Sequence, residues 1–340
     1  MSDIAARAGT SPAAVSVALN GAKSRTLRVS DDTRSRILEA ARELGYRRHP
    51  VARALATGRT HVLGLMLPYA SIYFGESTPF ESVIIDGVVA EAGRRGYNLM
   101  LYSATAEDEG ERAAGMVDRR IDGLIVVVPH DDSAPLQECE RQGIPTAAIL
   151  ARPQAATITI RSDDYRGGLV AVRHLLGLGH RRIAHLYGRE TVVTSEPRYQ
   201  GYRQALCEAG VEPAPELCLP GDFTSQKGRE STVRWLELPP ERRPTAIFAA
   251  NDLSAHGAID AIHAAGGKVP DDFSVVGYDD TWFATVTRPA LTTVSMQVRE
   301  LGCRAAALMI SFLEGEQVAD YHPVLPVSLI QRESSGPAPP

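Results

Sequence analysis

Several features that mark other classes of protein are scarce or absent in this chain of 340 residues. Its four cysteines are scattered and form no C-x-x-C pair, which argues against a metal or redox site of that kind. No apolar run reaches the roughly 18–20 residues that a membrane span needs. The first four residues lack the basic and apolar regions of a secretory signal. We therefore predict a cytoplasmic protein without a metal, a cofactor or a membrane partner.

Familiar catalytic motifs are also missing. The sequence contains no G-x-S-x-G elbow, no Walker loop, no complete G-x-G-x-x-G and no H-E-x-x-H. The pairs Asp163-Asp164, Asp271-Asp272 and Asp279-Asp280 could suggest glycosidase carboxylates. Adjacent residues in a turn rarely converge on one substrate, so turn and capping roles are expected instead. We predict that the protein is not an enzyme.

Net charge is distributed unevenly along the chain. Residues 1–60 contain eleven Lys and Arg against five Asp and Glu, a net charge of +6. Residues 61–340 contain twenty-five against thirty-six, a net charge of −11. A small basic module on a large acidic body suggests that the module binds a polyanion. A solvated basic tail is the alternative, but this segment is patterned for folding.

The amino-terminal segment has the pattern of a helix-turn-helix. Residues 4–8 carry apolar side chains at helical spacing, and the stretch ends at Gly9. Ser11 and Pro12 suit the N-cap and the first position of a second helix, which ends before Gly21. The connection of about three residues has the length that helix-turn-helix motifs use.

A third helix is predicted after a basic loop. Ser30 suits its N-cap, and Asp31 and Asp32 lie where the positive end of the helix dipole favours acidic side chains. Gly45 ends the pattern. The inward stripe of this helix is expected to consist of Ile37, Leu38, Ala41 and Leu44.

The second helix is predicted to expose small side chains that can sit deep in a major groove. Alanine, valine and proline can touch thymine methyl groups there, and serine can donate or accept a hydrogen bond. The expected exposed residues are Pro12, Ala13, Ala14, Ser16 and Val17. A generic three-helix packing unit is the alternative interpretation.

Residues 47–60 predict a short helix bracketed by Pro50 and Gly58. A helix of about two turns is marginal alone in water, so we expect DNA or another partner to hold it. Leu55 would be an exposed apolar side chain suited to enter between base steps in a minor groove. The alternative is an ordinary linker, with Leu55 packed on the body of the protein.

Several segments carry a resemblance to a known family: Asp3-Ile4-Ala5-Ala6-Arg7-Ala8-Gly9-Thr10-Ser11-Pro12-Ala13-Ala14-Val15-Ser16, Leu19-Asn20-Gly21, Val29-Ser30-Asp31-Asp32-Thr33-Arg34, Glu43-Leu44-Gly45-Tyr46 and Ala52-Arg53-Ala54-Leu55-Ala56-Thr57-Gly58-Arg59-Thr60. They resemble the lactose-repressor family of bacterial regulators (LacI/GalR). The resemblance implies a set of DNA contacts: Ser11, Pro12, Ala13, Ala14, Ser16, Val17, Asn20, Arg28, Arg53 and Leu55. Position 17 is commonly arginine in this family, so Val17 puts the usual base preference in doubt but not DNA binding.

From residue 61 the pattern changes to alternating strands and helices, which is typical of parallel sheets wrapped by helices. A body of this length suits two such sheets better than one. The expected strands are Val62–Leu67, Tyr97–Tyr102, Gly123–Val128, Thr146–Leu150, Arg182–Tyr187, Thr245–Ala249 and Ser274–Tyr278. The expected helices are Phe80–Arg95, Glu107–Arg119, Tyr165–Leu178 and Leu253–Ala265. Ligands bind beyond the carboxyl ends of such strands, so two facing lobes would form a cleft.

The family resemblance continues over this body, in stretches that include Arg120-Ile121-Asp122-Gly123-Leu124-Ile125, Arg198-Tyr199-Gln200-Gly201-Tyr202, Ala250-Asn251-Asp252 and Val276-Gly277-Tyr278-Asp279-Asp280. It implies a two-lobed, periplasmic-binding-protein-like core. The implied effector-binding residues are Arg198, Asn251 and Asp279, with Phe80 and Phe223 as apolar walls. An arginine fork, an amide and a carboxylate at strand ends suit a polar ligand. A structural salt bridge or helix cap is the alternative for each polar residue.

Some positions depart from the family pattern. Ala151 follows the fourth strand, where galactoside-binding members have an acidic residue. Met296 and Val298 stand where the last crossover often supplies a polar and an aromatic contact. We therefore predict a small polar effector, with a sugar favoured and a purine-like ligand left open.

The predicted organisation is that of an α/β protein with an appended DNA-binding module: headpiece 1–46, hinge 47–60, effector-binding core 61–334 and disordered tail 335–340. The first lobe is expected at about 61–160 and 291–320, and the second at about 161–290 and 321–334. The predicted function is a sequence-specific, homodimeric transcription regulator whose partners are double-stranded operator DNA and the effector. A solute-binding protein of a transporter is the alternative, but the basic headpiece and the absent export signal argue against it.

Overall fold

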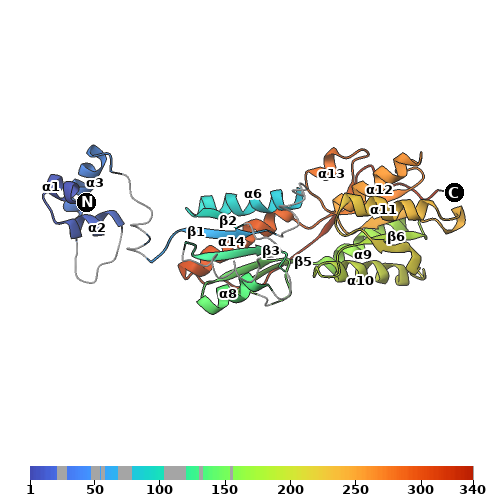
Figure 1. Ribbon diagram of the computed structural model, residues 1–340, viewed down its shortest axis with the longest axis horizontal. Coiled ribbons are helices and arrows are strands. Elements are labelled where there is room, and N and C mark those ends of the chain that lie inside the picture. Colours follow the sequence, from blue (N-terminus) through green and yellow to red (C-terminus); the bar gives the residue numbers. More distant parts are fainter. Residues whose placement is uncertain are drawn as a thin grey trace. The chain divides into compact units, whose positions relative to one another are not determined.

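The computed structural model describes residues 1–20, 29–46, 54, 58–67, 79–102, 120–129, 133–153 and 156–339. The chain divides into two compact units, one of residues 1–62 with 118–122 and one of residues 63–117 with 123–340 (Figure 1). Four predictions lie outside the described residues: the helix Glu107–Arg119 and the DNA contacts Arg28, Arg53 and Leu55.

The described part of residues 1–46 forms three helices, as predicted: α1 (Ser2–Ala8), α2 (Pro12–Asn20) and α3 (Asp31–Glu43). α1 ends at Gly9, whose φ of 62° is the left-handed conformation that favours glycine. Ser11 Oγ accepts a hydrogen bond from Ala14 N at 3.2 Å. Ser30 Oγ accepts one from Thr33 N at 3.3 Å. Both predicted N-caps are therefore confirmed.

The core of this unit is made of small and branched apolar side chains from all three helices. Two predictions about it are wrong. Ala14 was expected on the exposed face of α2 but is 8% exposed, because it lies one turn before the buried Ala18 on the inward face. Leu44 was expected in the inward stripe but is 48% exposed, because α3 ends at Glu43 and the chain leaves the helical path there.

Between the headpiece and the core, part of the predicted hinge is described. Gly58 N donates a hydrogen bond to Ala54 O at 2.8 Å, and the φ of Gly58 is 69°. This is the geometry of a helix end at Gly58, where the sequence predicted one. Asp122 then accepts hydrogen bonds from Thr60 N at 2.7 Å and His61 N at 2.8 Å, which anchors the segment that enters the core.

Two six-stranded sheets lie in the second unit (Figure 1). The first has the order β11-β5-β4-β3-β1-β2, with β1 (Val62–Met66), β2 (Asn98–Tyr102), β3 (Gly123–Val127), β4 (Thr146–Ile149), β5 (Ile158–Ser162) and β11 (Val324–Leu325). The second has the order β12-β10-β9-β8-β6-β7, with β6 (Ile183–Tyr187), β7 (Cys218–Pro220), β8 (Ala246–Ala249), β9 (Ser274–Asp279), β10 (Thr292–Ser295) and β12 (Ser328–Ile330). β12 pairs antiparallel with β10, and the other registers that are resolved are parallel.

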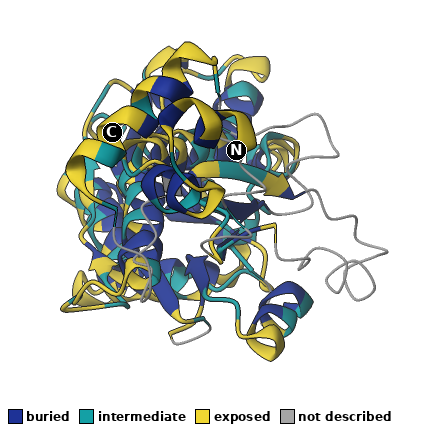
Figure 2. Ribbon diagram, turned by 90° about the vertical axis from the view of Figure 1, so that its left-hand side faces the viewer, coloured by how far each residue is buried: buried dark blue, intermediate teal, exposed yellow. Residues whose placement is uncertain are grey.

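Helices cover the faces of both sheets: α6 (Pro79–Arg94), α8 (Ala134–Gln142), α9 (Asp164–Gly177), α10 (Ser195–Glu208), α11 (Ser225–Leu236), α12 (Asp252–Ala264), α13 (Phe283–Val286) and α14 (Val298–Glu314). α14 packs against α6 and strands β3 to β5, α9 packs against α10, and α11 packs against α12. Figure 2 shows exposed residues on the outer faces of the helices and buried ones toward the sheets. No helix within the described ranges is long and apolar enough to cross a membrane.

The chain passes between the two sheets after β5, after β10 and after β11, and the last two crossings correct the predicted lobe boundaries. β10 pairs with β9 in the second sheet, although residues 291–320 were assigned to the first lobe. β11 pairs with β5 in the first sheet, although residues 321–334 were assigned to the second. Strands this short have too few residues for a sequence pattern to show which sheet they join. The backbone pairing of the fold was needed to identify their partners.

The prediction of a disordered tail is wrong for residues 335–339, which pack on the second lobe. Gly336 N donates to Ser274 Oγ at 3.0 Å, and Gly336 O accepts from His180 Nε2 at 3.1 Å. Ala338 N donates to Leu178 O at 2.9 Å. The composition, rich in Ser, Gly and Pro, indicated disorder, but the lobe supplies partners for the backbone of the tail.

Candidate functional site

A buried arginine is held at the carboxyl ends of the second sheet. Arg198 of α10 is 3% exposed, and its Nε donates to Asp164 Oδ1 at 2.8 Å. Its Nη1 donates to Ala250 O, after β8, at 2.6 Å. The guanidinium also lies over the ring of Tyr278 of β9, with 3.7 Å between Cζ and the ring centroid. Partners from α9, β8 and β9 therefore fix the orientation of the guanidinium.

Two buried carboxyl groups accompany this arginine. Burial raises the pKa of Asp279, at the end of β9, well above its ordinary value; Asp252 raises this pKa further, and Arg198 opposes the shift. Burial also raises the pKa of Asp252 to about 7, against a hydrogen bond from Thr293 Oγ1 at 2.5 Å. A carboxyl group that holds its proton can donate as well as accept a hydrogen bond, which suits a partner with hydroxyl groups.

Asn251 and Phe223 support each other beside Arg198. Asn251 caps α12, since its Oδ1 accepts from Ser254 N at 2.9 Å. Its Nδ2 donates to Phe223 O at 3.0 Å, which holds Phe223 at a φ of 62°. The Phe223 ring lies 6.0 Å from the Arg198 Cζ and against Gly188, where a Cβ would come within 2.1 Å. The structure thus brings Arg198, Phe223 and Asn251 together, with Asn251 also serving the capping role that the sequence allowed.

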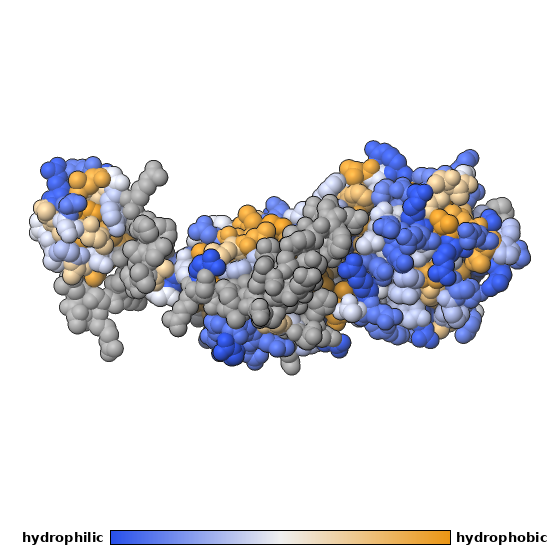
Figure 3. Space-filling model, viewed as in Figure 1, coloured by the Kyte–Doolittle hydropathy of each residue, from blue (hydrophilic) through white to orange (hydrophobic). Residues whose placement is uncertain are grey.

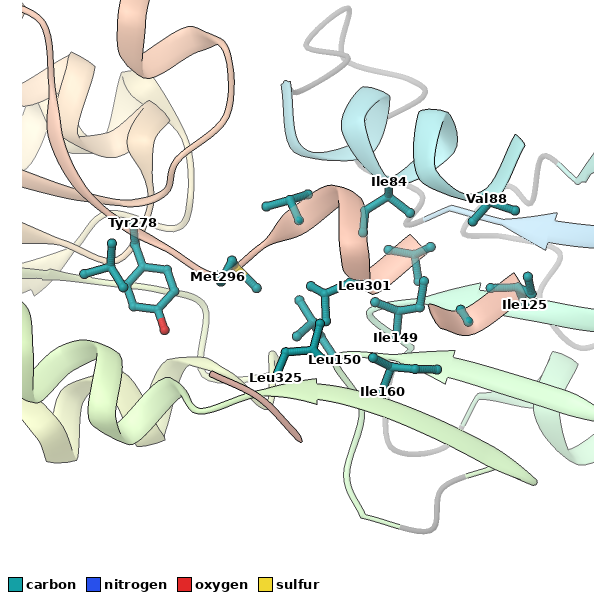
Figure 4. Close-up of a cluster of buried hydrophobic side chains, with 14 of the residues drawn as sticks. Ile84, Val88, Ile125, Ile149, Leu150, Ile160, Tyr278, Met296, Leu301 and Leu325 are labelled. Atoms are coloured by element: carbon teal, nitrogen blue, oxygen red, sulfur yellow. The ribbon is translucent and has the colours of Figure 1, made fainter. Parts of the chain in front are cut away.

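The first lobe contributes α6 to the same region. Phe80 is half-buried and packs against the apolar cluster that contains Tyr278 and Met296. Figure 4 shows Met296 between Tyr278 and the side chains of the first lobe around Leu301. Glu81 is 8% exposed, and its charge raises the pKa of Asp279 from across the junction.

Sequence reasoning missed several residues of this site. Asp164 was expected in a turn or cap, and Asp163 does cap α9 by accepting from Arg166 N at 3.1 Å. Asp164 instead pairs with Arg198. Met296, noted only as a departure from the family pattern, accepts from Arg198 Nη2 through its sulfur at 3.7 Å. Within the described ranges no three His, Cys, Asp or Glu residues are placed to hold a metal ion.

The pairing of Arg198 with Asp164 depends on a close approach of α9 and α10. A Cβ on Gly168 would lie 2.2 Å from Arg198 O, and a Cβ on Gly201 would lie 2.2 Å from Tyr165 O. Both glycines therefore face the backbone of the opposite helix. Backbone atoms cannot move aside as the end of a flexible side chain can. Glycine at these two positions lets the helices lie close enough for the ion pair.

We expect Gly168→Ala to lower the free energy of unfolding by about 1–3 kcal/mol, because the added methyl group overpacks the contact of α9 with α10. Urea denaturation measures the change. Gly177→Ala is the matched control, since it lies in the same helix and a Cβ there meets nothing within 4 Å. Equal behaviour of the two variants would contradict the proposed role of the close approach.

The headpiece carries the residues predicted to contact DNA on α2. Ser11, Pro12 and Ala13 are exposed, and Ser16 and Val17 are half-buried. Asn20 is the last residue of α2. An ion pair of 2.8 Å between Arg7 and Glu43 joins α1 to α3 on the surface. The exposed residues of α2 can therefore approach another surface while its other face packs in the headpiece core.

Comparison with known proteins agrees with both parts of the chain. Residues 1–49 match the bacterial regulatory proteins of the lacI family, and residues 172–335 match the periplasmic binding protein-like domain. The HTH-type transcriptional regulator DegA of Bacillus subtilis is 33% identical over 341 residues, which cover 98% of this chain and 97% of DegA.

Solved structures of regulators resemble the whole chain. The transcriptional regulator CelR in complex with cellobiose has a TM-score of 0.74 and 31% identity, with 98% of both chains covered. The lac repressor dimer bound to operator and the anti-inducer ONPF has a TM-score of 0.81 and 28% identity, again with 98% of both chains covered. This chain therefore belongs to the lacI family of bacterial transcription regulators.

Proposed function

We propose that this protein is a cytoplasmic, homodimeric repressor whose affinity for its operator changes when a sugar or sugar derivative binds beside Arg198. The observation that carries the proposal is the fixed guanidinium of Arg198, paired with Asp164 at 2.8 Å next to the buried carboxyl group of Asp279. Such a preorganised set of donors and acceptors is what a ligand rich in hydroxyl groups requires.

The hydrogen-bonding capacity of Arg198 supports a polar ligand. A guanidinium has five N–H donors, and three nitrogens each use one on Asp164, Ala250 and Met296. Two N–H groups are left without a partner among the described residues, and they can donate to adjacent hydroxyl oxygens. CelR, with a similar fold, was solved with cellobiose.

Dimerisation is proposed through the first lobe. Val89 on α6 is 49% exposed, and Leu101 on β2, the edge strand of the first sheet, is 55% exposed. Figure 3 shows hydrophobic residues gathered over α6. A two-fold dimer would present two headpieces to the two halves of a symmetric operator. In such a dimer, the second subunit would cover the apolar surface around Val89 and Leu101, which a monomer leaves in water.

The effector is proposed to act by changing how the two lobes sit relative to each other. Glu81 and Phe80 come from the first lobe and Arg198 and Asp279 from the second, so a ligand between them contacts both. Its differential affinity for two lobe arrangements would shift the separation of the headpieces. An effector that weakens binding to the operator and one that strengthens it are both compatible with this coupling.

A purine-like ligand is the second candidate, and the ring of Phe223 favours it. That ring lies 6.0 Å from the Arg198 Cζ and could stack on a flat base. Screening sugars and nucleobases against the same protein–operator complex separates the two candidates, because only the true effector should change operator affinity.

We expect selection from a random double-stranded DNA pool to enrich a two-fold symmetric site. Two headpieces that each neutralise several phosphates should also make operator binding weaken steeply as salt rises. Sequencing of the retained DNA and binding titrations at several salt concentrations measure both properties, with a scrambled site as control. Enrichment of an asymmetric site would contradict the dimer, and no enrichment at low salt, with or without a sugar mixture, would contradict the function.

A further inference from the structure

Helix α2 of the headpiece is largely apolar on both of its sides. The inward side packs in the headpiece core and consists of Ala14, Val15, Ala18 and Leu19. The outward side is exposed or half-buried and consists of Pro12, Ala13, Ser16 and Val17. The two sets alternate every two residues, which is the spacing that places them on opposite sides of a helix. Because the outer side of a surface helix is normally polar, this one suits a partner that offers apolar groups.

The outward side of α2 has little capacity to read bases through hydrogen bonds. Residues 12–19 include no Arg, Lys, Asn or Gln, the side chains that form paired hydrogen bonds with guanine or adenine. Ser11 Oγ already accepts from Ala14 N at 3.2 Å as the N-cap. Ser16 has a single hydroxyl group, which can bond to several bases and so distinguishes little between them. Asn20 ends the helix, beyond the amino-terminal residues that contact base edges in helix-turn-helix proteins.

Val17 has the bulkiest side chain on this outward side. It is half-buried. Among the described residues, the partly buried apolar side chains that pack on the headpiece core are those of Val29, Leu38 and Tyr46, and Val17 is not one of them. Ala13 lies one helical turn before Val17 on the same side, so the two form one apolar surface.

The partner of this surface is DNA, since residues 1–49 match the lacI family of regulatory proteins. The second helix of a helix-turn-helix lies in the major groove, with its amino-terminal residues on the base edges. The apolar group that base pairs present in that groove is the C5 methyl group of thymine. Small side chains also let the helix backbone come close to the bases, so a methyl group at the base edge is within reach of Ala13 and Val17.

We infer that α2 recognises its operator through contacts of Ala13 and Val17 with thymine methyl groups, and not through paired hydrogen bonds to guanine or adenine. The inference rests on the proposed function, because it concerns the operator that the two headpieces bind. It narrows that operator to half-sites with T·A pairs under α2, and it makes Val17 a specificity-determining residue. Affinity that does not depend on sequence comes from phosphate contacts elsewhere in the basic headpiece.

Two altered bases separate a methyl contact from a hydrogen bond. Uracil has the hydrogen-bonding groups of thymine without its methyl group, whereas 5-methylcytosine has the methyl group with the hydrogen-bonding groups of cytosine. Each replaces one thymine at a time in the operator selected from the random pool, first in one half-site and then in both. Labelled duplexes are titrated with the full-length protein at one salt concentration, and thymines outside the half-sites are the control.

We expect uracil to weaken binding about 4-fold at a thymine that α2 contacts, and about 15-fold when the symmetry-related thymine is replaced as well, since burial of one methyl group contributes about that factor. At the same position, 5-methylcytosine paired with guanine should bind within about two-fold of thymine, because α2 lacks the side chains that would detect the changed hydrogen-bonding groups. Unmethylated cytosine should bind as weakly as uracil.

Variants then assign the methyl contact to Val17. Val17→Ala removes both methyl groups of the valine, so the effect of uracil should fall to less than about two-fold at one thymine of each half-site and stay unchanged at the others. Val29→Ala is the matched control, because it makes the same replacement at a half-buried valine that packs on the headpiece core outside α2. It should retain the uracil effects of the wild type. Each variant is compared with itself on thymine and uracil duplexes, so a change in its stability does not alter the ratio.

The outcomes separate the inference from the proposed function. Equal binding of uracil and thymine at every position, or a selected half-site without thymine, overturns the inference and leaves the DNA-binding regulator in place. Binding of 5-methylcytosine as weak as that of cytosine also overturns it, because hydrogen bonds would then be read. Retention of every uracil effect in Val17→Ala overturns the assignment to Val17. Failure to select any site at low salt, with or without a sugar mixture, overturns the proposed function and the inference together.

Discussion

Arg198→Ala is expected to lower the free energy of unfolding by about 3–5 kcal/mol, the cost of leaving a buried charge without its partner. Asp164 is 7% exposed and accepts from Arg198 Nε at 2.8 Å, so removal of the guanidinium strands the Asp164 carboxylate. The carbonyl of Ala250 also loses its donor. Urea denaturation at neutral pH measures the loss, and the same variant should no longer change its operator affinity with effector.

Asp164→Asn in the Arg198→Ala background separates the loss of stability from the loss of the response to effector. An amide at position 164 carries no charge and can still accept from Tyr278 OH, which now donates at 3.2 Å. The double variant should therefore be more stable than Arg198→Ala alone and should remain unresponsive to effector. If the double variant were less stable than either single variant, the ion pair would not be the source of the loss. If it still responded to effector, Arg198 would not bind the ligand.

Local features of the sequence were enough to predict the headpiece and most of the core strands. Serine caps, a helix-ending glycine and apolar spacing each act within a few residues, and Ser11, Ser30 and Gly9 behave as those rules require. All seven predicted strands form within about two residues of their expected ends. Strands β5, β7, β10, β11 and β12 were missed, and most of these are short or polar.

The site was harder to predict, because its chemistry depends on contacts between distant segments. Arg198 and Asp164 are 34 residues apart and meet only because glycines allow α9 and α10 to touch. Roles that depend on one strand end, such as those proposed for Asn251 and Asp279, were within reach of the sequence.

Folding of this protein should also depend on pH through Asp252. Burial raises the pKa of Asp252 from 3.8 to about 7 in the folded protein. The folded state therefore holds this proton more tightly than the unfolded chain does. The stabilisation is fully present below about pH 4, where both states are protonated, and is lost as the pH rises through about 7.

We expect the stability of the wild type relative to Asp252→Asn to fall by about 4 kcal/mol between pH 4 and pH 8, since three pKa units correspond to about that free energy. Urea denaturation of both proteins across this pH range measures the difference in their free energies of unfolding. Groups that titrate in the same way in both proteins cancel from this difference. Asp271→Asn is the matched control, because it makes the same replacement at an exposed aspartate. A constant difference between wild type and Asp252→Asn would mean that Asp252 is ionised in the fold, held by its bonds to Thr293 and the Thr281 amide. The carboxyl groups near Arg198 would then carry one more negative charge, which would favour an uncharged effector over an acidic one.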